Sequence, residues 1–272
     1  MIIDCHCHAG KGDLLTGPWD TNAPIEPYLR RARAAGIDKT IVFAAFHSDY
    51  SVANEGVARI IRRFPDRLLG FAFVHPRRDA GRIFQMVRRA VSEWSFRGIK
   101  AHGYEAMATR EVCETARAFR IPLLVDVVGK AETVDLLATE YPDVNFIIPH
   151  FGSFKDDWQA QQRVVDQLIR YPNVYADTSG IRRFDYIVQA IERGGVRKIL
   201  FGSDGPWLHP ALELHKIRLL GLKPDQEALI TGGNVMRLIR QARVGRQALK
   251  VPARVAATPP PSQEVKPFKY EL

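Results

Sequence analysis

The sequence has few cysteines, no long apolar run and no glycine-rich loop after its first expected strand. Its 272 residues include only three cysteines, Cys5, Cys7 and Cys113. An odd number with a CxC pair argues against a disulfide framework. No apolar stretch approaches the roughly 20 residues that a membrane-spanning helix needs. The N-terminal apolar residues run directly into ligand-type residues, so we expect no cleavable signal peptide. These absences predict a cytoplasmic protein with no membrane partner.

The charge is uneven along the chain, with a formal net value of +9. Residues 243–272 hold six Lys and Arg against two Glu, a net charge of +4, which leaves +5 for residues 1–242. The arginines of this longer part are scattered along expected helices, as on solvated helix faces, and no nucleic-acid-binding motif accompanies them. We therefore expect a small-molecule substrate and no nucleic-acid partner.

Short apolar segments alternate with amphipathic ones over most of the chain. Such apolar runs are typical of parallel strands covered by helices. We expect strands at residues 2–8, 40–45, 68–74, 98–102, 123–128, 145–150, 174–178 and 198–203. We expect helices at residues 25–35, 51–64, 80–94, 110–119, 131–141, 157–171, 184–193, 210–220 and 224–240.

Eight strands separated by helices predict an α/β fold, a distorted (β/α)8 or TIM barrel with one large core. A doubly wound open sheet is the alternative, but the glycine-rich phosphate loop that typically follows its first strand is missing. The barrel and an extra C-terminal helix are expected to occupy residues 1–242. Residues 243–272 are expected to form a basic tail, because their Ala-Thr-Pro-Pro-Pro-Ser segment cannot pack a core.

Ligand-type side chains follow the ends of the expected strands. His6 and His8 lie two residues apart, so both imidazoles project from one side of a strand and can share a divalent ion. An isolated HxH pair is more often an exposed polar strand end. Here further candidates follow the other strands: His47, His75, Lys100, His102, Asp126, His150, Asp177 and Asp204. Because the chemistry of a barrel lies at the carboxyl ends of its strands, this pattern predicts a metal site there.

Five segments resemble the amidohydrolase superfamily, within its amidohydrolase-2 branch of metal-dependent hydrolases and related decarboxylases. They are DCHCH (4–8), RGIK (97–100), IPHFG (148–152), FGSDGP (201–206) and GGNVMRL (232–238). The resemblance implies that His6 and His8 are metal ligands and that Asp204 is both a ligand and the proton acceptor for an attacking water. It also implies that His150 polarises the substrate or binds a metal, that zinc is the expected ion, and that a homodimer is common.

One position departs from the branch. The branch usually places a histidine ligand near the end of the fifth strand, where this chain has Asp126. Asp126 could replace that ligand, and its harder oxygen would then widen acceptance toward manganese or iron. It could instead orient another ligand, or the site could be degraded.

Other residues are candidates for binding the substrate. Lys100 lies where binuclear members of the superfamily carry a carboxylated lysine, but a cation that binds a substrate carboxylate or pairs with Asp126 is the simpler interpretation. His102 lies two residues further on the same face. Asp177 is expected to be a packed, hydrogen-bonded layer residue. Trp19, His47 and His75 are further candidates for the pocket, although both histidines also suit a structural role at the rim.

Three functions follow from these residues. The first is hydrolysis of an amide, lactone or ester by metal-activated water, with Asp204 as the base and His150 stabilising the oxyanion. The second is a non-oxidative decarboxylase of the same branch, in which no water attacks. The third is a barrel without chemistry that serves as a binding or scaffold subunit.

Overall fold

A computed structural model describes residues 1–15 and 21–252 of the chain. In it, the strands form a parallel barrel. Within these residues one sheet has the order β2-β1-β3-β4 and a second has the order β10-β9-β8-β7-β6-β5. The strands are β1 (Ile3–Lys11), β2 (Asn22–Ala23), β3 (Lys39–Ala44), β4 (Leu68–Gly70), β5 (Ala72–Phe73), β6 (Ile99–His102), β7 (Leu123–Asp126), β8 (Phe146–Ile148), β9 (Val174–Asp177) and β10 (Ile199–Leu200).

Backbone hydrogen bonds join the two sheets at both edges. The expected strand at 68–74 is divided into β4 and β5 at Phe71, whose N–H donates to Val42 at 3.0 Å. At the other edge the Cys5 N–H donates to the Phe201 carbonyl at 3.0 Å, and the segment after β10 bridges to β1. The ring therefore closes as β1, β3, β4–β5, β6, β7, β8, β9 and β10, and the predicted (β/α)8 arrangement is confirmed.

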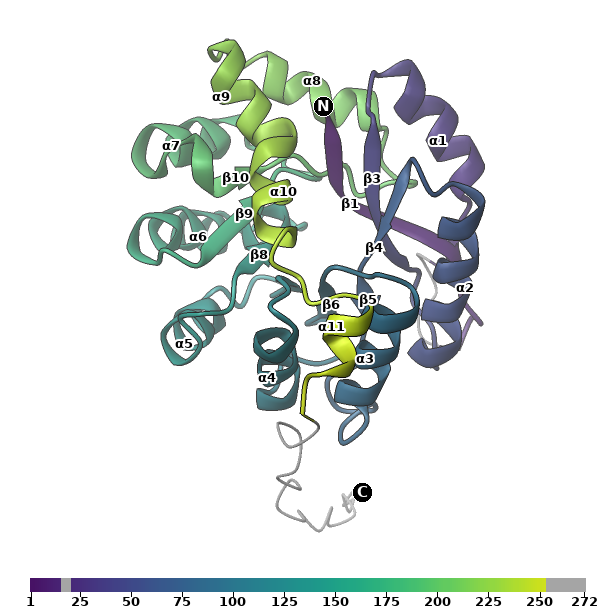
Figure 1. Cartoon of the computed structure of the whole chain (residues 1–272). Helices are drawn as coiled ribbons and strands as arrows, with labels where there is room; N and C mark the ends of the chain where they lie inside the picture. Colours follow the sequence, from purple (N-terminus) through teal and green to yellow (C-terminus); the bar gives the residue numbers. More distant parts are fainter. Residues whose placement is uncertain (16–20, 253–272) are drawn as a thin grey trace, which may run out of the picture.

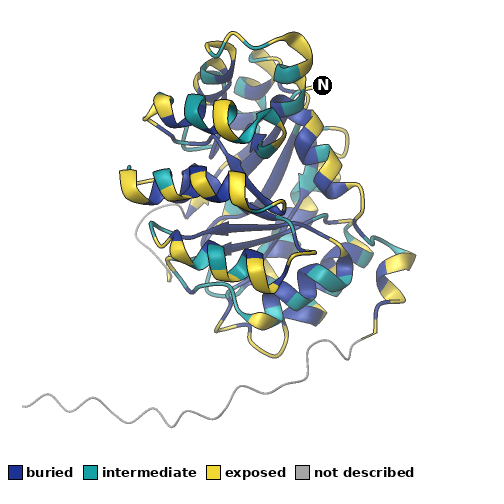
Figure 2. Cartoon of the chain, turned by 90° about the vertical axis from the view of Figure 1, so that its left-hand side faces the viewer, coloured by how far each residue is buried: buried dark blue, intermediate teal, exposed yellow. Residues whose placement is uncertain are grey.

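Helices surround the ring of strands (Figure 1). They are α1 (Ile25–Ala34), α2 (Tyr50–Arg63), α3 (Ile83–Glu93), α4 (Arg110–Phe119), α5 (Glu132–Glu140), α6 (Trp158–Arg170), α7 (Phe184–Gly194) and α8 (Pro210–Arg218). Figure 2 shows that buried residues gather in the strands and on the inner faces of the helices, whose outer faces are exposed. The near-continuous apolar strand segments thus pack against the helices on one side and against each other inside the barrel.

Local side chains explain several helix starts. Asp49 caps α2 by accepting a hydrogen bond from the Ser51 N–H, and Asp157 caps α6 by accepting from two backbone N–H groups. Pro210 occupies the first turn of α8, where a missing N–H costs nothing. These caps satisfy donors that a helix leaves unpaired at its N-terminus.

The expected helix at 224–240 is interrupted. It consists of α9 (Pro224–Ala228), a π-helical turn η3 (Leu229–Gly233) and α10 (Asn234–Ile239). A Cβ at Gly232 would lie 2.4 Å from the Met1 carbonyl oxygen, so a larger residue could not approach the N-terminus this closely. Gly232 therefore allows this segment to pack closely against the N-terminus of the chain.

Residues beyond the expected barrel boundary at 242 lie against the body. The Arg243 N–H donates to the Phe119 carbonyl, and helix α11 (Arg246–Leu249) contacts α3. Ala248 and Val251 are buried. The expected tail thus includes a docked part at 243–251, and residues 253–272 lie outside the described residues.

The docked segment predicts two different truncation results. Ending the chain after Pro252 should leave the Tm unchanged, whereas ending it after Ala242 should lower the Tm by several degrees. Burying a valine contributes about 1.5–3 kcal/mol, and each kcal/mol moves the Tm of a domain of this size by about 2–4 °C. Thermal unfolding of both truncations measures this. A clearly lower Tm for the longer truncation would show that residues 253–272 stabilise the fold.

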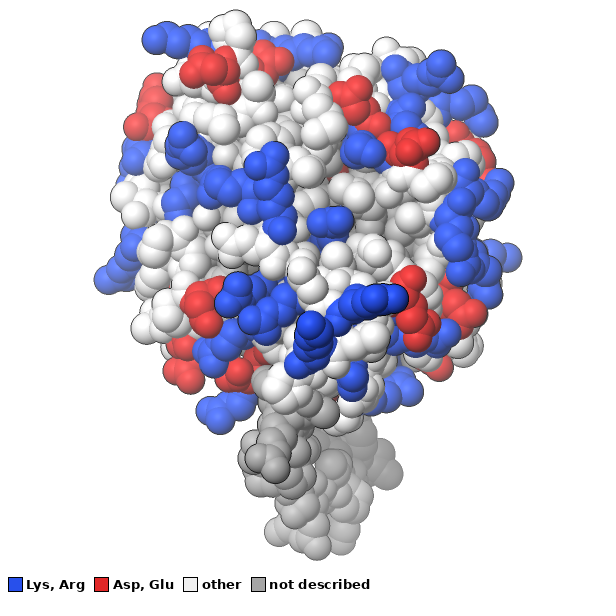
Figure 3. Space-filling model, in the orientation of Figure 1, with Lys and Arg blue, Asp and Glu red and all other residues white. Residues whose placement is uncertain are grey.

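Basic and acidic side chains are both exposed on the face drawn in Figure 3. Lys and Arg are spread over this face, and Asp and Glu lie mostly toward its edge. Within residues 1–15 and 21–252, no helix combines the length and apolar character needed to span a bilayer. The absence of a nucleic-acid partner stays a prediction.

Candidate functional site

An irregularity in β1 determines which of its side chains enter the barrel. The pairing of β1 with β3 shifts register between Asp4 and Cys7. Asp4 accepts a hydrogen bond from Tyr28 Oη of α1, on the helix side of the sheet, whereas His6 and His8 line a cavity. Asp4 therefore does not lie beside the two histidines, because the irregularity breaks the two-residue period of the strand.

His6, His8 and Asp204 converge at the strand ends. The Oδ1 atom of Asp204 lies 3.4 Å from His6 Nε2 and 3.8 Å from His8 Nε2. One ligand atom from each of these residues lies within 4.8 Å of the others. Asp204 adopts a positive φ of 55°, in a turn immediately after the eighth strand segment. Strain of this kind concentrates at functional sites.

The second nitrogen of each imidazole is held by the protein. His8 Nδ1 donates to the Ala44 carbonyl at 2.8 Å, and His6 Nδ1 donates to Asp177 Oδ2 at 2.8 Å. A carbonyl oxygen can only accept, so the proton of His8 lies on Nδ1 and its Nε2 presents a lone pair. Partners of this kind fix the orientation of metal-binding histidines.

Burial and charge favour the protonation states that metal ligands need. His6 and His8 are 1% and 3% exposed, and burial lowers the pKa of both. Burial acts to raise the pKa of Asp177, but His6, His150 and Ser179 together outweigh this effect and lower that pKa to about 2. Asp177 is therefore ionised and accepts the His6 proton. The neutral imidazoles of His6 and His8, together with the Asp204 carboxylate, are a donor set that suits a divalent metal.

Glycine allows His6 and Asp177 to approach each other. A Cβ at Gly202 would lie 2.9 Å from His6 Cβ and 3.1 Å from Asp177 Cγ. Any larger residue would therefore push these two side chains apart.

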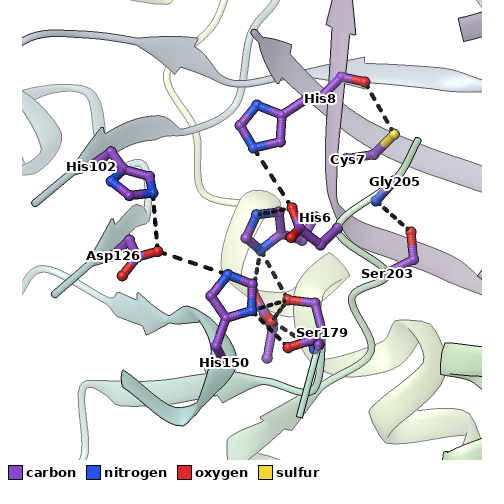
Figure 4. A network of polar contacts seen from close by, with 12 residues as sticks. His6, Cys7, His8, His102, Asp126, His150, Ser179, Ser203 and Gly205 are labelled. Carbon is purple, nitrogen blue, oxygen red and sulfur yellow. Dashed lines mark hydrogen bonds and ion pairs between the residues drawn. The ribbon is translucent and has the colours of Figure 1, made fainter. Parts of the chain in front are cut away.

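His150 lies beside His6, with ring centroids 5.1 Å apart (Figure 4). Its Nδ1 donates to the Ser179 carbonyl at 2.7 Å, so its Nε2 faces the cavity. His150 has a positive φ of 55° in the short 3-10 segment η1 (Pro149–Gly152). This left-handed turn directly after β8 places the imidazole at the barrel mouth.

Asp126 lies across the site from the cluster of His6, His8 and Asp204 and is not part of it. Its Oδ2 is 3.2 Å from His102 Nε2 and 3.8 Å from His150 Nε2 (Figure 4). Burial would raise the pKa of Asp126, but His102, His150 and Lys100 together hold it well below its usual value. Of the roles expected for Asp126, the geometry favours orienting neighbouring groups, while ligation stays a prediction.

A cavity of about 420 Å³ unites these side chains. Its polar lining includes the proposed metal residues with Lys100, His102, Asp126 and His150, and its apolar lining includes Phe46, Phe154 and Trp207. Lys100 and His102 both come from β6. This volume lies in the range of pockets that bind small molecules.

Two expected substrate residues, His47 and His75, are not found in this lining. His47 accepts a hydrogen bond from the Asp49 N–H, and His75 accepts from the backbone N–H groups of Arg77 and Arg78. Both histidines therefore organise turns at the rim, and the cavity gives no support to the prediction that they bind substrate. Trp19 lies outside the described residues.

Some lining and supporting residues were not expected from the sequence. Ser179 contacts His150 through both its carbonyl and its hydroxyl, and Phe154 and Lys155 line the cavity. The sequence offered one indication of a role for Ser179. This residue follows the end of an expected strand and precedes Gly180, a position typical of loop residues. Asp177 was expected as a hydrogen-bonded layer residue, and its partner proves to be His6.

Known structures share this fold at low sequence identity. A TIM-barrel protein from Bordetella bronchiseptica is 17% identical, with a TM-score of 0.69 and coverage of 88% of this chain and 98% of that chain. A probable 2-pyrone-4,6-dicarboxylic acid hydrolase from Acinetobacter baumannii is 16% identical, with a TM-score of 0.68 and coverage of 88% and 99%. A dihydroxybenzoic acid decarboxylase from a Polaromonas species, with bound manganese and the inhibitor 2-nitroresorcinol, is 18% identical, with a TM-score of 0.64 and coverage of 88% and 96%.

The sequence itself identifies the family. No curated protein matches the chain closely enough to be reported. The family model described as amidohydrolase, however, matches residues 3–241, nearly the whole chain. This match covers the strand ends that carry His6, His8, His150 and Asp204. The chain therefore belongs to the amidohydrolase family.

Proposed function

We propose that this protein is a metal-dependent hydrolase of a small molecule with an amide, lactone or ester bond. The observation that carries the proposal is the convergence of His6 Nε2 and His8 Nε2 on Asp204 Oδ1, at 3.4 and 3.8 Å. The donor set suits zinc, and manganese or iron are the alternatives. A divalent metal bound there would lower the pKa of water and polarise a carbonyl group.

The side chains around this cluster supply the remaining chemistry. Asp204 is the base, because one oxygen faces the histidines and the carboxylate can accept a proton from water. His150 directs Nε2 into the cavity, where it could contact the substrate oxygen on which negative charge develops. The Asp126 carboxylate lies 3.8 Å from this nitrogen and helps to fix the position of the ring. Asp126 thus acts as a positioning residue for His150 and His102.

This role predicts the behaviour of an Asp126→Asn variant. We expect it to keep its metal but to lose about 10–100-fold in turnover, the usual effect of removing a supporting partner. Asparagine retains the acceptor that holds the Val128 N–H at 2.8 Å, so the strand end should stay folded. Elemental analysis and steady-state kinetics measure the two effects. Loss of metal as complete as that caused by losing a histidine would instead identify Asp126 as a ligand.

A non-oxidative decarboxylase is the second candidate. The aromatic wall formed by Phe46, Phe154 and Trp207 favours it, since such a surface suits an aromatic acid. In that reaction the metal site would hold the substrate and no water would attack. Similarity to the Polaromonas decarboxylase fold is compatible with either reaction.

Product analysis separates the two reactions. The metal-loaded protein would be incubated with a panel of cyclic lactones and hydroxybenzoates in ¹⁸O-labelled water. Hydrolysis predicts one ¹⁸O atom in a ring-opened acid and no release of CO2. Release of CO2 with a proton replacing the carboxyl group would support the decarboxylase. If the metal-loaded protein converts no compound of the panel, the result would favour a non-catalytic barrel that serves as a binding or scaffold subunit. A cytoplasmic location and a homodimer stay predictions.

A further inference from the structure

Lys100 is a buried cation that faces the cavity. It comes from β6, two residues before His102, and is only 1% exposed. Its side chain lines the same cavity as His6, His8 and Asp204. Its ammonium lies 5.1 Å from the centroid of the Phe43 ring, a contact that compensates only part of the lost hydration.

No anionic group of the described residues pairs with this ammonium. No carboxylate oxygen in residues 1–15 and 21–252 lies within 4.0 Å of Lys100 Nζ, and no side-chain hydrogen bond joins it. The neighbouring carboxylates are closer to other groups: Asp126 to His102 at 3.2 Å, and Asp177 to His6 at 2.8 Å. The expected pairing of Lys100 with Asp126 is therefore not formed as a direct ion pair.

An unpaired buried charge is costly to keep. Moving an ammonium out of water carries a penalty of several kcal/mol unless an opposite charge and hydrogen bonds compensate it. Burial lowers the pKa of Lys100, and the surrounding aspartates oppose that shift. A negatively charged ligand group placed in the cavity would compensate the ammonium directly.

We infer that Lys100 forms a carboxylate subsite and that the substrate carries a carboxylate group beside the bond that reacts. This inference rests on the proposed function for the location of the reaction, but it holds for either hydrolysis or decarboxylation. His102 and Lys100 lie on one face of β6, so a ring acid could place its carboxylate on Lys100 and its ring against Phe46 and Trp207. Of the two lysines in the described lining, Lys100 is buried and Lys155 is exposed. One buried ammonium with an apolar wall suits a flat monoanion better than a dianionic phosphate, which needs more donors.

Calorimetric binding of benzoate and of its neutral isostere benzamide tests the inference. Both would be titrated into the full-length protein, once zinc-loaded and once treated with a chelator. The variants are Lys100→Met, Lys100→Gln and the control Lys130→Met, which removes an exposed lysine that does not line the cavity. We expect the wild type to prefer benzoate. The Lys100 variants should lose about tenfold or more in benzoate affinity, with benzamide affinity unchanged, and Lys130→Met should change neither by more than about threefold.

The outcomes separate this inference from the proposed function. A preference for benzoate that depends on Lys100 and persists after chelation would support the subsite even if the protein proves to hydrolyse nothing. Benzoate affinity that depends on zinc but not on Lys100 would overturn the subsite and leave the metal site intact. Equal loss of benzoate and benzamide binding would show a structural role for Lys100. Inorganic phosphate that binds more tightly than benzoate, in a Lys100-dependent way, would overturn the carboxylate class. Circular dichroism shows whether each variant is folded. If Lys100→Met is unfolded, the binding experiment is carried out with Lys100→Gln.

Discussion

The double variant His6→Ala, His8→Ala should lose its bound metal while the barrel stays folded. Both imidazoles present Nε2 to Asp204, and their Nδ1 atoms are already bonded to Asp177 and to the Ala44 carbonyl. Removing one supporting partner typically costs 10–100-fold in metal affinity, so the loss of two ligands should exceed about 100-fold. Elemental analysis after dialysis measures the metal content, and circular dichroism measures the fold.

The same variant should also be less stable than the wild type. The two histidines are only 1% and 3% exposed, so both side chains are packed inside the barrel. Their removal leaves a cavity and takes away one of the hydrogen-bond partners of the buried Asp177, which keeps its bonds from Ser179. His102→Ala is the matched control, because it removes a histidine from the same cavity outside the cluster, and it should keep its metal. A double variant with full metal occupancy would place the metal elsewhere.

Asp204→Asn should lower the kcat of the metal-loaded protein by about 10²–10⁴-fold, the usual contribution of a positioned general base. An amide oxygen can still face the metal site, but the amide cannot accept a proton from water. Metal affinity should also fall, because Asp204 Oδ1 is the negatively charged member of the cluster.

Kinetics at saturating metal separate these two consequences of Asp204→Asn. Added metal should restore occupancy but should not restore kcat. The control Asp185→Asn removes an exposed aspartate of α7 that pairs with Arg183, and it should leave both quantities unchanged. If Asp204→Asn regained wild-type kcat at high metal concentration, Asp204 would be a ligand without a role as base.

The sequence predicted the barrel and most of the polar strand ends because those signals are local. A short apolar run identifies a buried parallel strand, and the residue that follows it marks the carboxyl end. His6, His8, His150 and Asp204 could therefore be placed at one end of the barrel before any distance was known. The structure brings all four to one cavity.

The remaining details depend on contacts between segments far apart in the chain. The register shift in β1, which turns Asp4 toward Tyr28, depends on the pairing with β3. The partners of Asp126 depend on β6 and β7 lying side by side, which sets His102 opposite Asp126. The docking of residues 243–251 depends on α3 and Phe119. No periodicity or local propensity reports such pairings.

Crystallography with anomalous scattering at the zinc or manganese absorption edge tests the central claim most directly. The account predicts an anomalous peak near His6 Nε2, His8 Nε2 and Asp204, with ligand distances of about 2.0–2.2 Å, and Asp126 bonded to His102 instead. Fully metal-loaded crystals with no peak at these three residues would contradict it.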